Sequence, residues 1–143
     1  MPPDDNDPLH ALFHDLEQAI NEKRRKVDRS LGLRYRAQRR LLFLLHAMPG
    51  VGQKELIAIL DIRPASMSEL VRKLVERGLV HRKRGDRDKR RVDLSLTPTG
   101  QAIVARAQNR HHEVLEEIFG ALSKDERQQL CGLLEKSLGG SVV

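Results

Sequence analysis

Aromatic residues are scarce in this sequence of 143 residues, which contains three Phe, one Tyr and no Trp. A hydrophobic core must therefore be built mainly from Leu, Val and Ile, a composition that suits a helical protein. The scarcity also argues against an RNA-binding surface on which bases stack against aromatic rings. A chain of this length is expected to form one domain that buries about two thirds of its unfolded surface.

Cysteine and long apolar segments are equally scarce. The single cysteine, Cys131, excludes an internal disulfide framework and favours a reducing compartment. No apolar run approaches the ~20 residues of a membrane-spanning helix, and residues 1–5 do not resemble a signal peptide. We therefore expect a cytoplasmic protein without a membrane partner.

Motifs of catalysis are also missing. The sequence has no glycine-rich phosphate-binding loop, no Ser or Cys nucleophile motif and no HExxH. These absences predict a protein that is not an enzyme and that needs no cofactor.

Positive charge, by contrast, is abundant and concentrated. The net charge is +6, and residues 72–91 contain ten Lys or Arg against three Asp or Glu. Residues 101–143 contain five Lys or Arg against six Asp or Glu. An excess confined to twenty residues favours a polyanion partner over an ordinary solvated surface.

The basic stretch belongs to a recognisable pattern between Arg63 and Thr97. A helix is predicted over residues 64–77, with Pro64 in its first turn and Gly78 as its stop. Its apolar residues recur at helical spacing: Met67, Leu70, Val71 and Leu74. A hairpin with a cationic tip follows, because Val92, Leu94 and Leu96 alternate with polar residues. With a short helix over residues 53–60 and a turn at 61–63, this is the pattern of a winged helix-turn-helix that binds double-stranded DNA.

The remainder of the chain is expected to be helical. We predict further helices over residues 7–28, 35–48, 98–119 and 123–138, and a very short strand at residues 51–52 beside the hairpin. The fold class is thus mostly α with a small β-hairpin wing. Residues 1–6 are expected to be disordered, residues 35–97 to form the DNA-binding lobe, and residues 7–34 and 98–138 to form dimerisation helices.

The terminal helices have more apolar surface than one copy needs. Pairing with a second copy would bury this surface and set two recognition helices about one duplex turn, ~34 Å, apart. We therefore expect a homodimer formed through the N- and C-terminal helices. The alternative is that these helices cap the core of a monomer.

Residues 74–82 and 86–97, followed by Thr99 and Gly100, resemble the signature of the MarR family of transcriptional regulators. The resemblance extends over about residues 9–138. It implies a homodimeric winged helix-turn-helix that binds pseudo-palindromic operators, more often as a repressor than as an activator. It also implies that small ligands, metals or thiol oxidation relieve repression.

The resemblance assigns roles to two residues at the wing tip. Arg90 resembles the arginine that enters a narrow minor groove, and Asp88 would orient it through a charge-assisted contact. The full set of expected DNA-binding residues comes from the helix start, its exposed face and the wing: Arg63, Pro64, Ser66, Ser68, Arg72, Lys73, Lys83, Arg84, Arg87, Asp88, Lys89 and Arg90.

Glu69 departs from the family pattern, in which arginine is frequent on this helix. Its carboxylate could accept a hydrogen bond from cytosine, but pairing with Arg72 or Lys73 at helical spacing is favoured. Base specificity therefore does not carry over from relatives.

The effector is less well indicated. A ligand pocket in this family often lies between the DNA-binding lobe and the dimer helices, which points to Phe13, Leu16, Tyr35, Phe43 and His46 as its lining. Cys131 is expected to be a buried, inert thiol. The histidines are expected at the surface or at an interface, without a metal site. A zinc-responsive regulator of the same fold and a non-specific architectural DNA-binding protein remain alternatives.

Overall fold

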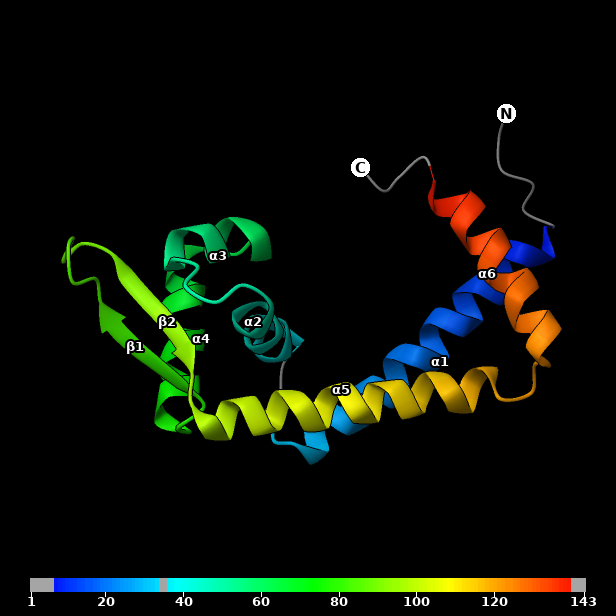
Figure 1. Ribbon diagram of the computed structural model, residues 1–143, viewed down its shortest axis with the longest axis horizontal. Helices are drawn as coiled ribbons and strands as arrows, with labels where there is room; N and C mark the ends of the chain where they lie inside the picture. The colour runs from blue at the N-terminus through cyan, green and yellow to red at the C-terminus, as the bar shows by residue number, and fades with distance from the viewer. Residues whose placement is uncertain (1–6, 34–35, 140–143) are drawn as a thin grey trace.

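The computed structural model describes residues 7–33 and 36–139 and contains, within them, six helices and one antiparallel hairpin (Figure 1). In chain order these are α1 (Pro8–Ser30), α2 (Arg36–Ala47), α3 (Gln53–Leu60), α4 (Pro64–Glu76), β1 (Val80–Arg84), β2 (Val92–Leu96), α5 (Pro98–Phe119) and α6 (Lys124–Leu138). The prediction of a mostly helical fold with a hairpin wing is confirmed. The expectation for residues 1–6 lies outside the described residues.

One hydrophobic core holds α2, α3, α4 and the hairpin together. The four α4 residues predicted to share a face are all buried, and Met67, Val71 and Leu74 are fully so. They pack in one cluster with side chains from the neighbouring elements: Leu41, Leu42, Leu45, Leu56, Leu60, Leu79, Val80, Leu94 and Val104. This apolar packing fixes α4 against the lobe and leaves its opposite face in solvent.

The hairpin pairs β1 with β2 in an antiparallel register that joins Val80 to Leu96 and Arg84 to Val92. An isolated bridge between Gly52 and Asp93 adds a third, minimal strand on the outer side of β2. The short strand predicted at residues 51–52 is thereby confirmed. The bridge attaches the wing to the segment that precedes α3.

Side-chain caps set three helix starts at the predicted positions. Asp7 accepts a hydrogen bond from the backbone N–H of Leu9 at 2.9 Å, and Thr97 accepts one from Gly100 at 2.9 Å. Ser123 and Glu126 form a reciprocal capping box at the start of α6. Each cap satisfies N–H groups that lack a partner in the first helical turn.

The long helix α5 joins the lobe formed by α2, α3, α4 and the hairpin to α1 and α6, which extend away from it (Figure 1). No residue of α6 is buried in the single chain. Cys131 is therefore exposed, which corrects the prediction of a buried thiol. The apolar side of α6 lies where the sequence pattern placed it, but within the described residues Leu133, Leu134 and Leu138 on that side stay exposed.

His111 is buried inside the single chain, whereas the histidines were expected at the surface or at an interface. Its Nε2 lies 3.5 Å from Oδ1 of the buried Asp28, and its ring meets that of Phe43 edge-on with centroids 5.9 Å apart. Asp28 belongs to α1, Phe43 to α2 and His111 to α5. These polar and aromatic contacts therefore lie where the lobe meets the long helices.

None of the helices within the described residues combines the length and the apolar character needed to cross a membrane.

Candidate nucleic-acid interface

The outward face of α4 is polar and open to solvent. Arg63 precedes the helix in an extended conformation, and Pro64 occupies its first turn, as predicted. Ser66, Ser68 and Arg72 are exposed, and Lys73 is half-buried. The structure thus presents the expected recognition-helix residues on the face opposite the core.

Charged side chains on this face are tied to one another. Arg72 donates from Nε to Glu69 at 3.0 Å, from a terminal nitrogen to the second Glu69 oxygen at 2.5 Å, and from the other terminal nitrogen to Glu76 at 2.6 Å. These hydrogen bonds raise the pKa of Arg72 and lower the pKa of Glu69 from their ordinary values. The predicted pairing of Glu69 with Arg72 is confirmed, and the Lys73 ammonium lies 4.0 Å from the same carboxylate.

The wing loop is organised by its own backbone. The N–H of Gly85 donates to Arg91 at 2.8 Å, and the N–H of Arg91 donates to Asp88 at 3.0 Å. The Asp88 carboxylate accepts from the backbone N–H of Arg90 at 3.0 Å. The expected Asp88–Arg90 contact is therefore made through the backbone N–H of Arg90 and not through its guanidinium. Asp88 thus fixes the loop backbone at Arg90, and the loop conformation sets the direction in which the Arg90 side chain points.

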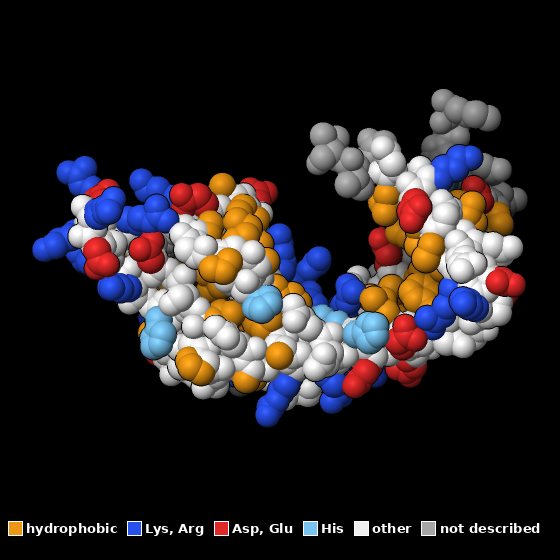
Figure 2. All heavy atoms as spheres, in the orientation of Figure 1, with side chains coloured by type: hydrophobic (Ala, Val, Ile, Leu, Met, Phe, Trp, Pro, Cys, Tyr) orange, Lys and Arg blue, Asp and Glu red, His pale blue; other side chains and the backbone are white. Residues whose placement is uncertain are grey.

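Cations dominate the wing. Residues 80–96 contain seven Lys or Arg and three Asp or Glu. The expected wing residues are all exposed: Lys83, Arg84, Arg87, Asp88, Lys89 and Arg90. Figure 2 shows Lys and Arg side chains gathered around the hairpin end of the molecule. The Lys83 ammonium forms an ion pair with the Asp86 carboxylate at 3.4 Å. The remaining positive charge suits phosphate groups.

Arg91 anchors the wing and was not among the predicted site residues. A terminal nitrogen of Arg91 donates to the carbonyl oxygen of Gly50 at 2.9 Å, and its Nε donates to Asp93 at 2.7 Å. Gly50 lies in the turn between α2 and α3, 41 positions earlier in the chain. No local sequence pattern signals such a contact, although the basic run did include Arg91.

Arg77 performs a similar task at the end of α4. Its two terminal nitrogens donate to the carbonyl oxygens of Gly32 at 2.6 Å and Leu31 at 3.3 Å. Gly32 has φ +75°, and a Cβ there would meet the Arg77 guanidinium at 2.6 Å. This contact fixes the C-terminal end of α4 to the segment that follows α1.

The base of the wing is fixed to the start of α5. Gly78, with φ +72°, follows the last turn of α4 and terminates the helix as predicted. The Thr97 hydroxyl donates a hydrogen bond to the Gly78 carbonyl oxygen at 2.6 Å. The same hydroxyl oxygen accepts from Gly100 and so caps α5. The end of α4, the base of the wing and α5 are therefore joined through one threonine.

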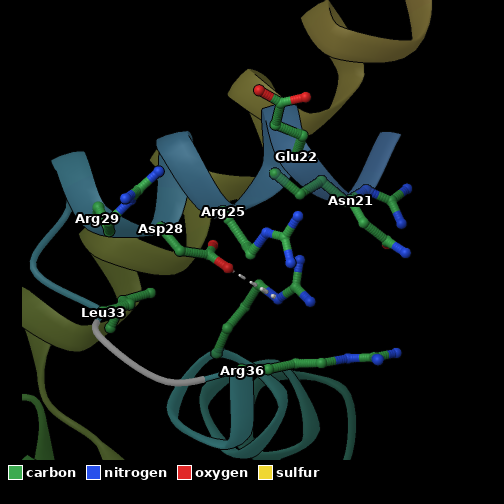
Figure 3. Close-up of a pocket in the computed structure, with 9 residues that line it drawn as sticks. Asn21, Glu22, Arg25, Asp28, Arg29, Leu33 and Arg36 are labelled. Carbon is green, nitrogen blue, oxygen red and sulfur yellow. Dashed lines mark ion pairs between the residues drawn. The ribbon is translucent and has the colours of Figure 1, made fainter. Parts of the chain in front are cut away.

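A cavity of about 740 Å³ lies between α1 and α2, beside the lobe (Figure 3). Five guanidinium groups and three other polar residues line it, together with Leu33: Arg24, Arg25, Arg29, Arg36, Arg39, Asn21, Glu22 and Asp28. Asp28 pairs with Arg39 at 3.5 Å, as the dashed line in Figure 3 marks. Burial lowers the pKa of Arg39, and the neighbouring Arg24 and Arg36 lower it further. Positive charge therefore exceeds negative charge around this cavity.

Among the described residues, Phe13, Leu16, Phe43 and His46 of the predicted effector pocket do not line this cavity. Phe13 is 53% exposed on the distal half of α1, and His46 is exposed at the end of α2. Leu16 and Phe43 are half-buried. Tyr35 lies outside the described residues. The arginines that line the cavity were not among the predicted residues, because their spacing along α1 and α2 looks like that of an ordinary charged surface.

Comparison with known proteins identifies the family. The MarR family model matches residues 35–92. The HTH-type transcriptional regulator BilQ of Clostridium symbiosum is 32% identical over 107 residues, which cover 75% of this chain and 71% of that protein. The homoprotocatechuate degradative operon repressor of Escherichia coli is 31% identical over 106 residues, 73% of this chain and 72% of that protein.

Solved structures agree with the fold described above. A mutant of S. aureus MepR bound to an oligodeoxyribonucleotide superimposes with a TM-score of 0.75 at 24% identity, covering 92% of this chain and 96% of that one. The winged helix, its position between long helices and the relatives in sequence all lead to one conclusion. This chain belongs to the MarR family of transcriptional regulators and is not an enzyme.

Proposed function

We propose that this protein is a homodimeric, ligand-responsive repressor that binds a pseudo-palindromic operator in double-stranded DNA. In this proposal α4 of each copy enters the major groove and each wing follows the adjacent minor groove and phosphates. The proposal accords with the E. coli relative, which is named as a repressor, and with the MepR structure, which is bound to an oligonucleotide.

The observation that carries the proposal is the cationic wing next to the exposed face of α4. The hairpin lies beside α4 in Figure 1, and the wing supplies four more positive than negative charges over residues 80–96. A helix with a free polar face and an adjoining basic loop fit a groove and its flanking phosphates respectively. Arg91 and Arg77 hold both elements in place before DNA arrives.

Apolar residues at the far end of the molecule support a dimer with a second copy. Leu9, Leu12 and Phe13 on α1 are 65%, 65% and 53% exposed, and Leu133, Leu134 and Leu138 on α6 are 63%, 45% and 53% exposed. Figure 2 shows apolar side chains gathered on the arm that contains α1 and α6. Apolar clusters of this kind mark protein contacts, and a twofold dimer would bring two wings to one side of a duplex.

The arginine-lined cavity supports the ligand response. It is bounded by α1, a proposed dimer helix, and by α2, part of the DNA-binding lobe. An anionic ligand bound there would neutralise the surplus positive charge and change how the two parts sit together. Thermal unfolding with a panel of small organic acids tests this, because a bound acid raises the melting temperature. Arg36→Gln should abolish the rise, and the control Arg106→Gln on α5 should retain it.

Selection of bound duplexes from a random DNA library tests the DNA-binding proposal. We expect enrichment of a two-part palindrome with half-site centres about one helical turn apart. Uniform binding to all duplexes would instead support a non-specific architectural protein. Failure to retain any duplex would overturn both.

The zinc-responsive alternative gains no support from the described residues. Within residues 7–33 and 36–139 there is no group of three or more His, Cys, Asp or Glu side chains placed to hold a metal ion. We therefore do not extend the proposal to a metal effector.

A further inference from the structure

The recognition helix and the wing differ sharply in charge. Residues 64–76 contain two basic residues, Arg72 and Lys73, and two acidic residues, Glu69 and Glu76, whereas residues 80–96 have a surplus of four cations. On net charge, the wing should therefore attract the phosphate backbone more strongly than α4 does. A neutral helix in the major groove is suited to discrimination between bases and not to affinity as such.

The Arg72 guanidinium is held by two carboxylates on its own helix. Glu69 occupies Nε and one terminal nitrogen, and Glu76 occupies the other terminal nitrogen. Arginine has five N–H donors, so these contacts use three and leave one on each terminal nitrogen. Two donors on the terminal nitrogens form the fork that guanine accepts through O6 and N7.

We propose that Glu69, Arg72 and Glu76 form a specificity filter, in which the two carboxylates present the Arg72 fork to a guanine and keep it from phosphates. This inference rests on the proposed function, because it requires α4 to enter the major groove. On a non-cognate sequence the carboxylates face phosphates without a compensating base contact, and repulsion weakens binding. On the operator, the guanine contact offsets that repulsion.

The side chains are placed for this role and not for stability. Arg72, Glu69 and Glu76 keep 49%, 52% and 62% of their side-chain surface exposed. Exposed pairs at helical spacing contribute little to the stability of a folded chain. Their geometry nevertheless restricts the many rotamers open to an exposed arginine, and such preorganisation favours one hydrogen-bonding partner over others.

The test compares variants in the full-length protein by selection from a random duplex library, followed by titration of the selected operator and of an unrelated duplex. The wild type should select a guanine in each half-site. Arg72→Lys keeps the charge but lacks the fork, so it should lose about 5- to 150-fold of the discrimination at that position while binding the unrelated duplex as before. Replacing the selected guanine with 7-deazaguanine removes the N7 acceptor and should weaken the wild type but not Arg72→Lys.

Removal of the carboxylates should have the opposite effect on non-specific DNA. The double variant Glu69→Gln/Glu76→Gln should bind the unrelated duplex more tightly, with a log–log salt slope steeper by about 0.9 per chain if Arg72 gains one phosphate. The matched control is Glu113→Gln on α5, which removes the acidic member of an exposed pair with Arg110 at 3.6 Å. That control should behave as the wild type on both duplexes.

The outcomes separate this inference from the proposed function. If the wild type retains no duplex at all, the DNA-binding proposal fails. If the wild type selects a palindrome but the double variant matches Glu113→Gln, or Arg72→Lys selects the same motif with equal discrimination, DNA binding stands and the filter is refuted.

Discussion

Gly100 contacts the backbone of Leu79 so closely that a Cβ at position 100 would overlap the Leu79 carbonyl oxygen. Gly100 is buried in the first turn of α5, and Leu79 links α4 to the wing. The Thr97 hydroxyl binds the backbone of both Gly78 and Gly100 at this point. One tight contact therefore sets the position of the wing relative to the long helix.

Gly100→Ala should destabilise the protein and displace the wing. An added methyl that meets backbone cannot be accommodated by a side-chain movement, so we expect a loss of about 1–3 kcal/mol in the free energy of unfolding, together with weaker operator binding. Urea unfolding and gel-shift titration measure the two effects. The control is Gly132→Ala in α6, where an added Cβ meets nothing within 4 Å and alanine should be neutral or stabilising. Equal stability of the two variants would contradict this interpretation.

Arg90→Ala should weaken operator binding and leave the fold unchanged. The side chain is exposed, and only its backbone N–H contacts Asp88 among the hydrogen bonds described above, so folding does not depend on its guanidinium. Loss of one phosphate or groove contact should flatten the log–log salt slope by about 0.9 per chain. Arg110→Ala, an exposed arginine on α5, serves as the control. An unchanged operator affinity would remove Arg90 from the interface.

Arg91→Gln should also weaken DNA binding, but through the position of the wing. The variant loses the hydrogen bonds to Gly50 and Asp93 that fix the hairpin to the turn after α2. Because this loss frees the wing before binding, we expect faster amide hydrogen exchange in residues 80–96 of the free protein. Arg90→Ala should leave that exchange unchanged. Slow exchange in Arg91→Gln would show that other contacts hold the wing.

His111 should make stability depend on pH. Burial lowers the pKa of His111 below its usual value, with a further contribution from Arg39, while Asp28 opposes both. Below about pH 6.5 the unfolded chain takes up a proton that the folded chain resists, so the free energy of unfolding should fall as the pH drops from 7.5 to 5.5. Urea unfolding at fixed protein concentration measures this fall. It should be smaller in His111→Gln than in the wild type or in His81→Gln, which changes an exposed histidine on β1. Equal pH dependence in all three would exclude His111 as the cause.

Most helix and strand positions could be predicted from the sequence, because local signals specify them. The 3.6-residue periodicity of α4, the proline and glycine at its ends and the Ser123–Glu126 capping box each depend on residues a few positions apart. The short strand expected at residues 51–52 beside the hairpin is also present, as the bridge between Gly52 and Asp93.

Contacts between segments that are far apart in the sequence could not be predicted from such local signals. Asp28 and His111 are 83 positions apart, and Arg77 reaches Gly32 across 45 positions, so no spacing rule brings either pair together. The prediction that Cys131 is buried was wrong for a related reason. Its apolar neighbours on α6 suggested a buried position, but no residue of α6 is buried in the single chain. The predicted DNA-binding residues lie on the expected elements. The arginine cavity could not be predicted, because it forms only where two helices, α1 and α2, meet.

The number of chains bound to one operator decides between a dimeric and a monomeric regulator. Sedimentation equilibrium of the wild type, of Leu133→Glu/Leu134→Glu and of the control Ile59→Glu, with and without the selected duplex, gives that number. We expect a free wild-type species of twice 16.3 kDa, two chains per palindrome, and a monomeric double variant with much weaker binding. A wild type that remains monomeric at micromolar concentration, or that binds one chain per palindrome at full affinity, would contradict this expectation.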